Sequence, residues 1–403
     1  MIKHNFPRVP YGCTVHGEEE IEAVVGVLKS STQMSKNVEE LEREISKLFE
    51  KKYGIMTNSG SSALYLAMES LKIEKGAEII TPPLTFATTV ASVVKNDLIP
   101  SFVDVKKDTF CIDEDLIEAS ITNNTRAILA PDLLGNLCNW EAIRKIADKH
   151  SLLVLHDSAD TLGATINGEY PGIYTDLSIT SFYGSHIING AGNGGMLCTS
   201  DPEVLNKGKL LRSWGRTSSI FEDSESIAER FKVRLEGIQY DAKFVFEELG
   251  YQLEPSEISA AFALVQLSKL KQNLELRRKF FDKHTNFFKK YKELFILPKE
   301  NPGTHTGWLA YPLIVKEEAK FTRTDLQIFL EERNIQTRVI FTGNILRQPG
   351  FKDIECIGKA DDFSNSDVVM KGGILLACHH GLTDNLVDHI HKSVELFLED
   401  KIS

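Results

Sequence analysis

Apolar and polar positions along the first 160 residues follow two different periods. Amphipathic helices are predicted where apolar side chains recur every three or four positions, at 19–30 and 38–52. Their apolar stripes consist of Ile21, Val24, Val25 and Leu28, and of Leu41, Ile45, Leu48 and Phe49. From residue 53 onward, short continuous apolar runs predict strands at 53–58, 77–83, 99–105, 125–135 and 152–160, with helices between them at 61–71, 85–95, 113–121 and 139–151. Uninterrupted apolar strands separated by helices are typical of a mainly parallel sheet covered on both faces.

The rest of the chain predicts the end of this sheet and a second, smaller domain. Closing strands are expected at 177–184 and 194–200. The polar segment 200–250 gives no clear prediction, and a Pro-Ser cap opens a long helical stretch at 255–294. Because 403 residues exceed what one ordinary core organises, we expect an α/β fold with a large domain over 1–270. A small C-terminal α+β domain is expected over 271–403.

Charge and composition exclude several classes of function. The net charge of −11 has the wrong sign for a nucleic-acid surface, which needs clustered Lys and Arg. No apolar run has the length of a membrane span, and the first residues lack the apolar stretch of a signal peptide. The six cysteines are widely spaced, which favours reduced thiols over a disulfide framework or a metal site. We therefore expect a cytoplasmic protein that binds neither nucleic acid nor membrane.

The carboxyl ends of the predicted parallel strands are where a ligand is expected to bind. Residues 58–62, Asn-Ser-Gly-Ser-Ser, follow the first strand and open a helix. Gly60, Ser61 and Ser62 would present backbone N–H groups and hydroxyls to an anion at the positive end of that helix. An ordinary helix N-cap explains the same residues, so this motif alone leaves both interpretations open.

Three further residues near strand ends narrow the choice of ligand. Phe86 can stack on a planar ring or belong to the core, and Asp157 can bind a ligand or cap a turn. Ser181 adds a hydroxyl at the end of a later strand. Together with the serine-rich turn, these residues suit a ligand with a phosphate, a flat ring and a ring nitrogen that a carboxylate keeps protonated. Those are the demands of pyridoxal phosphate (PLP), whose pyridinium ring accepts electrons.

Longer stretches of the chain resemble the sugar aminotransferase family of fold-type I PLP enzymes, which share the aspartate aminotransferase fold. The matching stretches, in family order, are NSGSSAL, GAEIITPPLTFATTV, FVDVKKDTFCIDEDLIEAS, HDSADTLGATINGEYPG, SITSFY and EISAAFALVQL. The resemblance implies PLP, or its amine form pyridoxamine phosphate (PMP), as the cofactor. It also implies a homodimer with its sites at the subunit interface.

His186 stands where this family has the lysine that binds the cofactor covalently. The replacement resembles a dehydratase branch that removes the C3 hydroxyl of nucleotide-linked 4-keto-6-deoxy sugars, for dideoxysugars of surface polysaccharides. It implies a cofactor held without a covalent bond, L-glutamate as amino donor, and His186 as the catalytic group that moves protons. An imidazole, with a reference pKa near ~6.5, can take up and release a proton near neutral pH. The resemblance also makes Asp157 catalytic, by stabilising charge on the ring, and places Asp160 beside the cofactor's phenolic oxygen.

Members of this branch include CDP-4-keto-6-deoxyglucose 3-dehydrase and GDP-4-keto-6-deoxymannose 3-dehydratase, and residues 337–351 resemble both. The first of these enzymes carries an iron–sulfur cluster on closely spaced cysteines after a Trp-Gly-Arg segment. Residues 214–231 begin in the same way but contain no cysteine, so no iron–sulfur cluster is expected here. Within 337–351, Arg338, Asn344 and Arg347 are candidate contacts for the nucleotide sugar, or ordinary surface and turn residues.

Several positions leave alternatives open. Glu254 falls where relatives place a residue near the phosphate of the partner's cofactor, and a carboxylate there would repel it. His379 and His380 are neighbours on a predicted strand and point to opposite faces, which favours structural or substrate-facing roles over a metal site. If His186 is instead a buried structural histidine, the chain is a nucleotide-sugar aminotransferase or a non-catalytic binding protein with a PLP fold.

Overall fold

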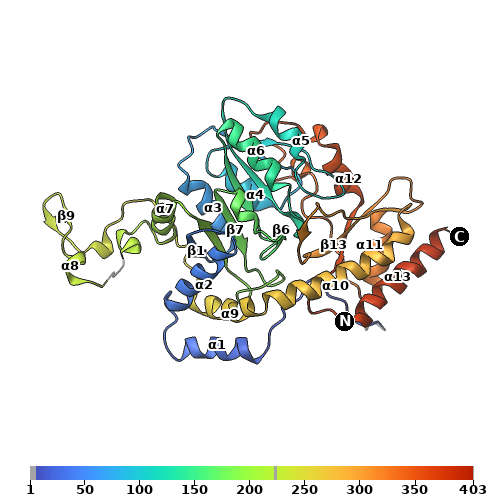
Figure 1. Cartoon of the computed structure of the whole chain (residues 1–403), viewed down its shortest axis with the longest axis horizontal. Helices are drawn as coiled ribbons and strands as arrows, with labels where there is room; N and C mark the ends of the chain where they lie inside the picture. The colour runs from blue at the N-terminus through green and yellow to red at the C-terminus, as the bar shows by residue number, and fades with distance from the viewer. Residues whose placement is uncertain (1–5, 222–224, 403) are drawn as a thin grey trace.

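Within the described residues of the computed structural model, 6–221 and 225–402, a seven-stranded sheet organises the larger part of the molecule (Figure 1). In spatial order its strands are β1 (Tyr53–Thr57), β8 (Gly195–Thr199), β7 (Leu177–Ser181), β5 (Leu153–Asp157), β4 (Thr125–Pro131), β2 (Glu78–Thr81) and β3 (Ile99–Phe102). β8 runs antiparallel to β1 and β7, whereas β7, β5, β4, β2 and β3 pair in parallel. The predicted α/β fold with a mainly parallel sheet is confirmed.

Helices cover both faces of this sheet. Successive side chains of a strand point to opposite faces, so a continuous apolar strand needs apolar partners on both. Ile79 packs in an apolar cluster with side chains of α3 (Gly60–Ser70) and α7 (Pro202–Arg212). Ile80, the next residue, packs in a second cluster with α6 (Trp140–His150). Both isoleucines are completely buried. A continuous apolar run therefore contributes side chains to both clusters, one on each face of the sheet.

The two N-terminal helices differ in how they use their apolar stripes. α2 (Lys36–Lys47) packs on α9 and β1, and it buries most of its predicted stripe: Leu41, Ile45 and the following Phe49. The predicted stripe of α1 (Glu18–Leu28) is largely exposed, with Ile21 at 45%, Val25 at 38% and Leu28 at 60%. Glu20 is buried instead, because its carboxylate accepts a hydrogen bond from Gln266 and pairs with Lys269, both at 2.7 Å.

The long helical stretch predicted at 255–294 is two helices that meet at Lys269. α9 (Glu257–Ser268) packs on α1 and α2, and α10 (Leu270–Phe288) runs on to a second sheet (Figure 1). This sheet and its helices comprise β11 (Phe295–Ile296), β13 (Ala310–Val315), β14 (Gly373–Ala377), α11 (Arg323–Glu332), α12 (Ser364–Gly372) and α13 (Asp384–Ile402). Val9, from the N-terminal segment, joins the apolar core of this smaller part.

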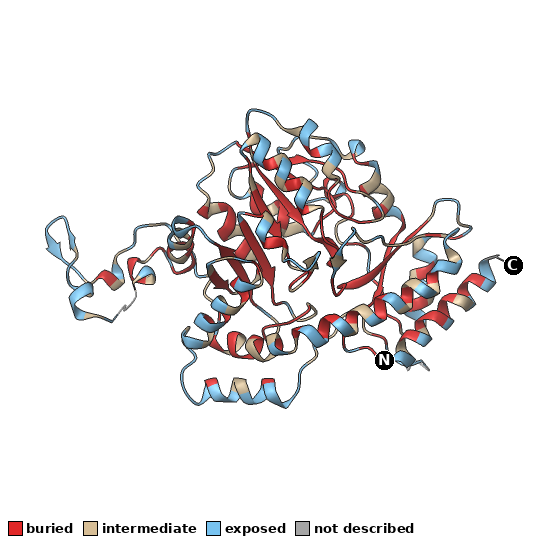
Figure 2. Ribbon diagram, in the orientation of Figure 1, coloured by how far each residue is buried: buried red, intermediate tan, exposed pale blue. Residues whose placement is uncertain are grey.

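An arm projects from the body between α7 and α9 (Figure 1). It contains α8 (Ile227–Arg230) and a short hairpin of β9 (Arg234–Leu235) and β10 (Ile238–Gln239). Much of the arm is exposed (Figure 2), including large apolar side chains: Ile227 at 76%, Ile238 at 67%, Phe244 at 60%, Phe246 at 56% and Leu249 at 94%. Gathered apolar exposure of this kind is typical of an interaction surface. None of the described helices has the length and apolar content to cross a bilayer.

Candidate active site

A cavity of about 530 Å³ opens at the carboxyl ends of β4, β5 and β7, beside the first turns of α3 and α4 (Ala87–Val94). The sequence-predicted residues on its wall are Gly60, Ser61, Phe86, Asp157, Asp160, Ser181 and His186. The predicted residues away from this wall are Ser62, Arg338, Asn344 and Arg347. The cavity lies where ligands of parallel sheets bind, because the carboxyl ends of adjacent parallel strands meet at one edge.

The first turn of α3 forms the anion-binding part of the wall. Ser59 caps the helix by accepting a hydrogen bond from the Ser62 backbone at 3.1 Å. The Ser62 hydroxyl donates to Asn58 Oδ1 at 2.6 Å, so it completes the cap, while Ser61 lines the cavity. A Cβ at Gly60 would lie 2.6 Å from Ser181 Cβ, closer than packed carbons allow. Glycine thus permits the positive end of α3 to lie against β7.

Asp157 ends β5 and is 6% exposed. Its Oδ2 accepts a hydrogen bond from the Thr89 hydroxyl at 2.9 Å, and its Oδ1 accepts one from the Ala159 backbone at 3.2 Å. Burial raises the pKa of this carboxyl, an effect that the two hydrogen bonds partly offset. A cationic nitrogen in the cavity would restore its charge, because an opposite charge nearby favours the ionised form.

Phe86 is 54% exposed at the N-terminus of α4 and is therefore not a core residue of this chain. Its ring meets that of Phe341 edge-on, with centroids 5.9 Å apart. Beside it, the Thr85 hydroxyl lines the cavity and is buried, and it has no hydrogen-bond partner among the described residues. An exposed ring and an unpaired hydroxyl on one wall suit a ligand with a flat ring and polar substituents.

His186 lies five residues beyond the end of β7 and forms part of the wall of the same cavity. Its Nδ1 lies 3.2 Å from the Ser181 carbonyl oxygen, which can only accept, so the ring proton sits on Nδ1. Burial lowers the pKa of this imidazole, the Ser181 hydrogen bond raises it, and the nearby Arg277 cation lowers it, which together leave the pKa at about 4. At neutral pH the ring is therefore uncharged, and Nε2 carries a lone pair that can accept a proton.

Asp160 is the carboxyl closest to that lone pair. Its Oδ1 lies 3.9 Å from His186 Nε2, which is too long for a hydrogen bond. Its Oδ2 accepts a hydrogen bond from the Leu134 backbone at 2.9 Å. Burial raises the pKa of Asp160, the Leu134 hydrogen bond lowers it, and the neighbouring Asp157 raises it, which leaves the pKa at about 7. At neutral pH His186 is therefore uncharged and Asp160 is only partly ionised, so the two do not form a full ion pair.

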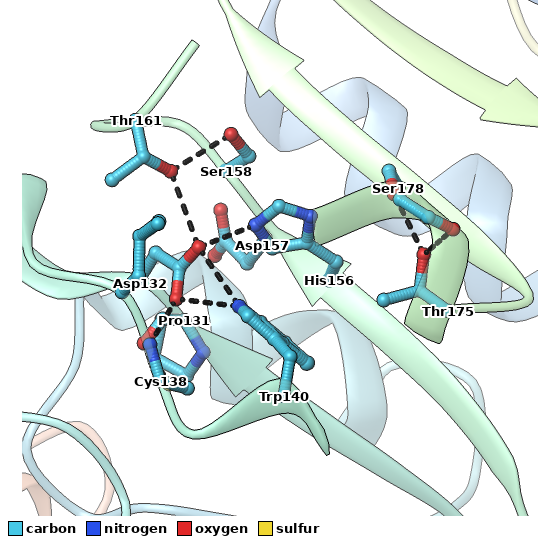
Figure 3. A network of polar contacts seen from close by, with 12 residues as sticks. Pro131, Asp132, Cys138, Trp140, His156, Asp157, Ser158, Thr161, Thr175 and Ser178 are labelled. Atoms are coloured by element: carbon cyan, nitrogen blue, oxygen red, sulfur yellow. Dashed lines mark hydrogen bonds and ion pairs between the residues drawn. The ribbon is translucent and has the colours of Figure 1, made fainter. Parts of the chain in front are cut away.

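A second buried Asp–His pair, Asp132 and His156, lies close by, and its Asp132 is also on the cavity wall (Figure 3 shows the pair). His156 Nε2 lies 2.7 Å from Asp132 Oδ2, and the two side chains are 1% and 0% exposed. Asp132 also accepts hydrogen bonds from the Trp140 indole at 3.1 Å and from the Cys138 backbone at 2.7 Å. The Thr161 hydroxyl adds a longer contact at 3.4 Å. Protein donors therefore occupy the hydrogen-bonding positions of this carboxylate, and its bond to His156 links the ends of β4 and β5.

The three residues predicted to contact a nucleotide sugar are placed differently from one another. Arg338 is exposed, and its guanidinium lies 5.5 Å from the ring centre of Tyr11, which is on the cavity wall. Asn344 is buried and donates to the Ala360 carbonyl at 2.8 Å. Arg347 pairs with Asp367 at 2.6 Å and with Asp361 at 2.8 Å. The structure thus brings Arg338 to the edge of the site and engages the other two in local bonds.

Sequence reasoning missed two residues of the site. Tyr11 lies in a segment without helical or strand periodicity, and burial raises the pKa of its hydroxyl above the usual range. Arg277 lies on α10 beneath His186 and resembles an ordinary charged helix residue in the sequence. No motif marks either residue, because both reach the site through long-range packing. His379 and His380 are buried near Arg277, and the described residues offer no ligand cluster for a metal.

The model of the DegT/DnrJ/EryC1/StrS aminotransferase family matches residues 14–395. The chain is 32% identical over 409 residues to the dTDP-4-dehydro-2,6-dideoxy-D-glucose 3-dehydratase of Saccharopolyspora spinosa, covering 99% of this chain and 88% of that protein.

Two solved structures are similar over nearly the whole chain. The E. coli GDP-4-keto-6-deoxy-D-mannose-3-dehydratase with bound hydrated PLP has a TM-score of 0.85 and 27% identity, covering 97% of this chain and 99% of that one. A GDP-4-keto-6-deoxymannose-3-dehydratase with a trapped PLP–glutamate geminal diamine has a TM-score of 0.84 and 26% identity, covering 96% and 100%.

The residues present on the cavity wall fit PLP or PMP. The first turn of α3, with Ser61 and Ser181, suits the phosphate, and the buried Asp157 suits the ring nitrogen. The unpaired Thr85 hydroxyl and the exposed Phe86 ring offer further contacts to the flat ring. The described residues of the cavity wall include no lysine, so these non-covalent contacts would carry the whole of the binding.

Proposed function

We propose, from the premise that this chain belongs to the DegT/DnrJ/EryC1/StrS aminotransferase family of PLP-dependent enzymes, that it is a nucleotide-sugar 3-dehydratase. The predicted family and its PLP cofactor are confirmed. The proposed reaction removes the C3 hydroxyl of a nucleotide-linked 4-keto-6-deoxy sugar, with L-glutamate as the amino donor. The observation that carries the proposal is His186, an uncharged imidazole on the cavity wall with its Nδ1 proton tied to the Ser181 carbonyl.

The tautomer of His186 suits a proton carrier. Because the Nδ1 proton is donated to Ser181, the basic nitrogen is Nε2, next to the cavity. Nε2 would take one proton from the C4′ carbon of the bound cofactor and deliver it to the C3 hydroxyl oxygen, whose bond to C3 breaks as it leaves as water. A carboxylate form of Asp160, 3.9 Å away, stabilises the imidazolium while it exists. A lysine amine in this place would bind the cofactor covalently, which an imidazole does not do.

The remaining wall residues hold and orient the cofactor. When bound, PMP supplies an amine for the sugar's C4 ketone and a ring that accepts electrons. Gly60 and Ser61 bind the phosphate at the N-terminus of α3, and Asp157 keeps the ring nitrogen protonated. Phe86 covers one side of the site and excludes water from it. The product is a 3,6-dideoxy-4-keto sugar that serves the synthesis of a surface polysaccharide.

We also propose that the chain works as a homodimer. Its exposed apolar side chains concentrate on the arm and on α1 rather than being scattered singly. A second copy of the chain would cover both, since homodimer interfaces bury large apolar areas. A concentration series in analytical ultracentrifugation tests this, and a monomer at micromolar concentration would contradict it.

The test of the reaction uses the purified chain with PLP, L-glutamate and a panel of CDP-, GDP- and dTDP-linked 4-keto-6-deoxy sugars. Dehydration replaces the C3 hydroxyl by hydrogen, and each turnover releases one 2-oxoglutarate and one ammonia. Mass spectrometry of the sugar and enzymatic assays of both by-products follow the reaction. Ammonia and a deoxygenated sugar in equal amounts are the expected result.

Two other outcomes separate the alternatives. An aminotransferase would return an amino sugar that keeps its C3 hydroxyl, without release of ammonia. Borohydride treatment would then trap the cofactor on a lysine, which peptide mass spectrometry detects. A non-catalytic binding protein would bind PLP but leave glutamate and every sugar of the panel unchanged.

A further inference from the structure

The guanidinium of Arg277 is completely buried beneath the loop that carries His186. Its five N–H groups meet five acceptors: the carbonyl oxygens of Ser185 (3.1 Å), His186 (3.0 Å), Trp308 (3.2 Å) and Leu309 (3.1 Å), and Nδ1 of His380 (3.2 Å). A guanidinium has five N–H donors, so its hydrogen-bonding capacity is used in full. These hydrogen bonds go to uncharged acceptors rather than to a carboxylate, which is unusual for a buried charge.

The five acceptors belong to three segments that are far apart in the sequence. Residues 185–186 follow β7 of the large sheet, 308–309 precede β13 of the small sheet, and His380 follows β14. Arg277 itself lies on α10, the helix that passes from one sheet to the other (Figure 1). One side chain therefore ties the backbone of His186 to the frame of the smaller part of the molecule.

We propose that Arg277 is a positioning residue for His186, which fixes the His186 backbone through its fork of donors and keeps a positive charge beside the imidazole. This inference rests on the proposed function of His186 as a proton carrier. A nearby cation disfavours the protonated imidazole, so it helps to keep Nε2 available as a base. The same charge favours the ionised form of Asp160, the carboxyl that faces Nε2.

Other charged and titratable groups also lie near the His186 imidazole and Arg277. Asp160 lies 3.9 Å from the His186 ring, and the Tyr183 ring centre lies 5.9 Å from it. His379 and His380 also lie close to Arg277, and burial lowers the pKa of each, to about 4 and about 3. Both are therefore uncharged at neutral pH, so Arg277 is the cation that acts on His186.

Three variants separate the charge of Arg277 from its hydrogen bonds. Arg277→Met removes both, whereas Arg277→Lys keeps a positive charge but offers three donors for five acceptors. Arg277→Gln is neutral yet retains a donor, and it replaces the methionine variant if that variant fails to fold. The matched control is Arg278→Met, because the neighbouring Arg278 is paired with Glu300 and Asp282 away from the cavity.

The first measurement needs neither substrate nor cofactor. Histidine ring carbons are labelled with ¹³C, and His186 is assigned by its loss in His186→Asn. The titration runs from pH 3.5 to 8, and in the unaltered chain and in Arg278→Met we expect the His186 midpoint at about pH 4. A smaller step near pH 7 reports the ionisation of the neighbouring Asp160. In Arg277→Met or Arg277→Gln, we expect its titration midpoint to rise by about one pH unit or more. An unchanged midpoint in a folded neutral variant would overturn the electrostatic part of the inference.

The second measurement is turnover of the PLP-loaded chain. We expect Arg277→Lys to lose about tenfold or more in kcat while KM for the nucleotide sugar changes by less than about threefold, because misplacing a reacting group affects the reacting step. Turnover within about twofold of the unaltered chain would overturn the positioning part. If no sugar is dehydrated yet the midpoint still shifts, the proposed function fails and the role of Arg277 stands. If dehydration occurs without any shift, the inference alone fails.

Discussion

The molecule contains two Asp–His pairs close together, and they differ in how completely they are bonded. Asp132 and His156 are 2.7 Å apart and buried, and a backbone N–H, an indole and a hydroxyl complete the carboxylate (Figure 3). Asp160 and His186 are 3.9 Å apart, and Asp160 accepts one backbone hydrogen bond at 2.9 Å. The first pair is a closed structural joint, whereas the second leaves a basic nitrogen and a carboxyl facing a cavity.

The difference shows that residue type does not identify a reacting group. Both histidines lie near the carboxyl end of a parallel strand, and both are close to an aspartate. The two pairs differ in how many protein donors hydrogen-bond to the aspartate carboxylate. Each such hydrogen bond occupies a lone pair, so a carboxylate with more of them has less capacity to bind another group. An Asp–His pair with unused capacity at a cavity is therefore the one to expect in chemistry.

The largest effect that tests this comparison is expected for His186→Lys. The amine should bind PLP covalently, which an absorbance change and borohydride trapping would detect. Dehydration should fall about 10²–10⁴-fold, because the proton carrier is lost. The control His156→Lys should disrupt folding instead, since it places an unpaired charge in the core. Retained dehydration in His186→Lys would mean that another group moves the proton.

A second test replaces each aspartate by asparagine in the cofactor-free chain and measures the free energy of unfolding by urea. The pKa of Asp160 is raised to about 7 in the fold. The unfolded carboxyl ionises first as pH rises, so the unaltered chain loses stability between about pH 4 and 7. Asp160→Asn should escape this loss and be about 1–4 kcal/mol more stable at pH 8, with a smaller difference at pH 5.

Asp132→Asn should have the opposite sign. It removes a carboxylate that several donors share, and leaving buried donors unpaired costs about 1–3 kcal/mol at either pH. If Asp160→Asn and Asp132→Asn both increase the free energy of unfolding, or if neither does, the distinction between a closed and an open pair is wrong.

The smallest expected effect compares the two histidines in stability alone. His156→Asn should lower the free energy of unfolding by about 1–3 kcal/mol, because Asp132 loses a buried partner. His186→Asn should change it by about 1 kcal/mol or less, since its ring faces the cavity and makes one weak backbone contact at 3.2 Å. Thermal unfolding followed by circular dichroism measures both. A larger loss for His186→Asn would favour a structural histidine.

The sequence correctly predicted the features that depend on residues close together along the chain. The alternation of apolar runs and helices placed each strand of the large sheet, because strand and helix periods are local properties. It also led to Gly60, Ser61 and Asp157, which lie next to strand ends, whereas the family resemblance led to His186; all four line the cavity. For α1 the period was right but the buried face was not, since Glu20 found partners on α9 and the next helix.

The order of residues thus specified the fold class, the family and the candidate residue His186, because these follow from motifs within short windows. Tertiary structure decided which of two Asp–His pairs stays open, which ring nitrogen carries the proton, and that Arg277 lies beneath the loop. The two Asp–His pairs join residues 24 and 26 positions apart, and Arg277 contacts His186 across 91 positions. Such distances are set by packing of the whole chain, and no local pattern encodes them.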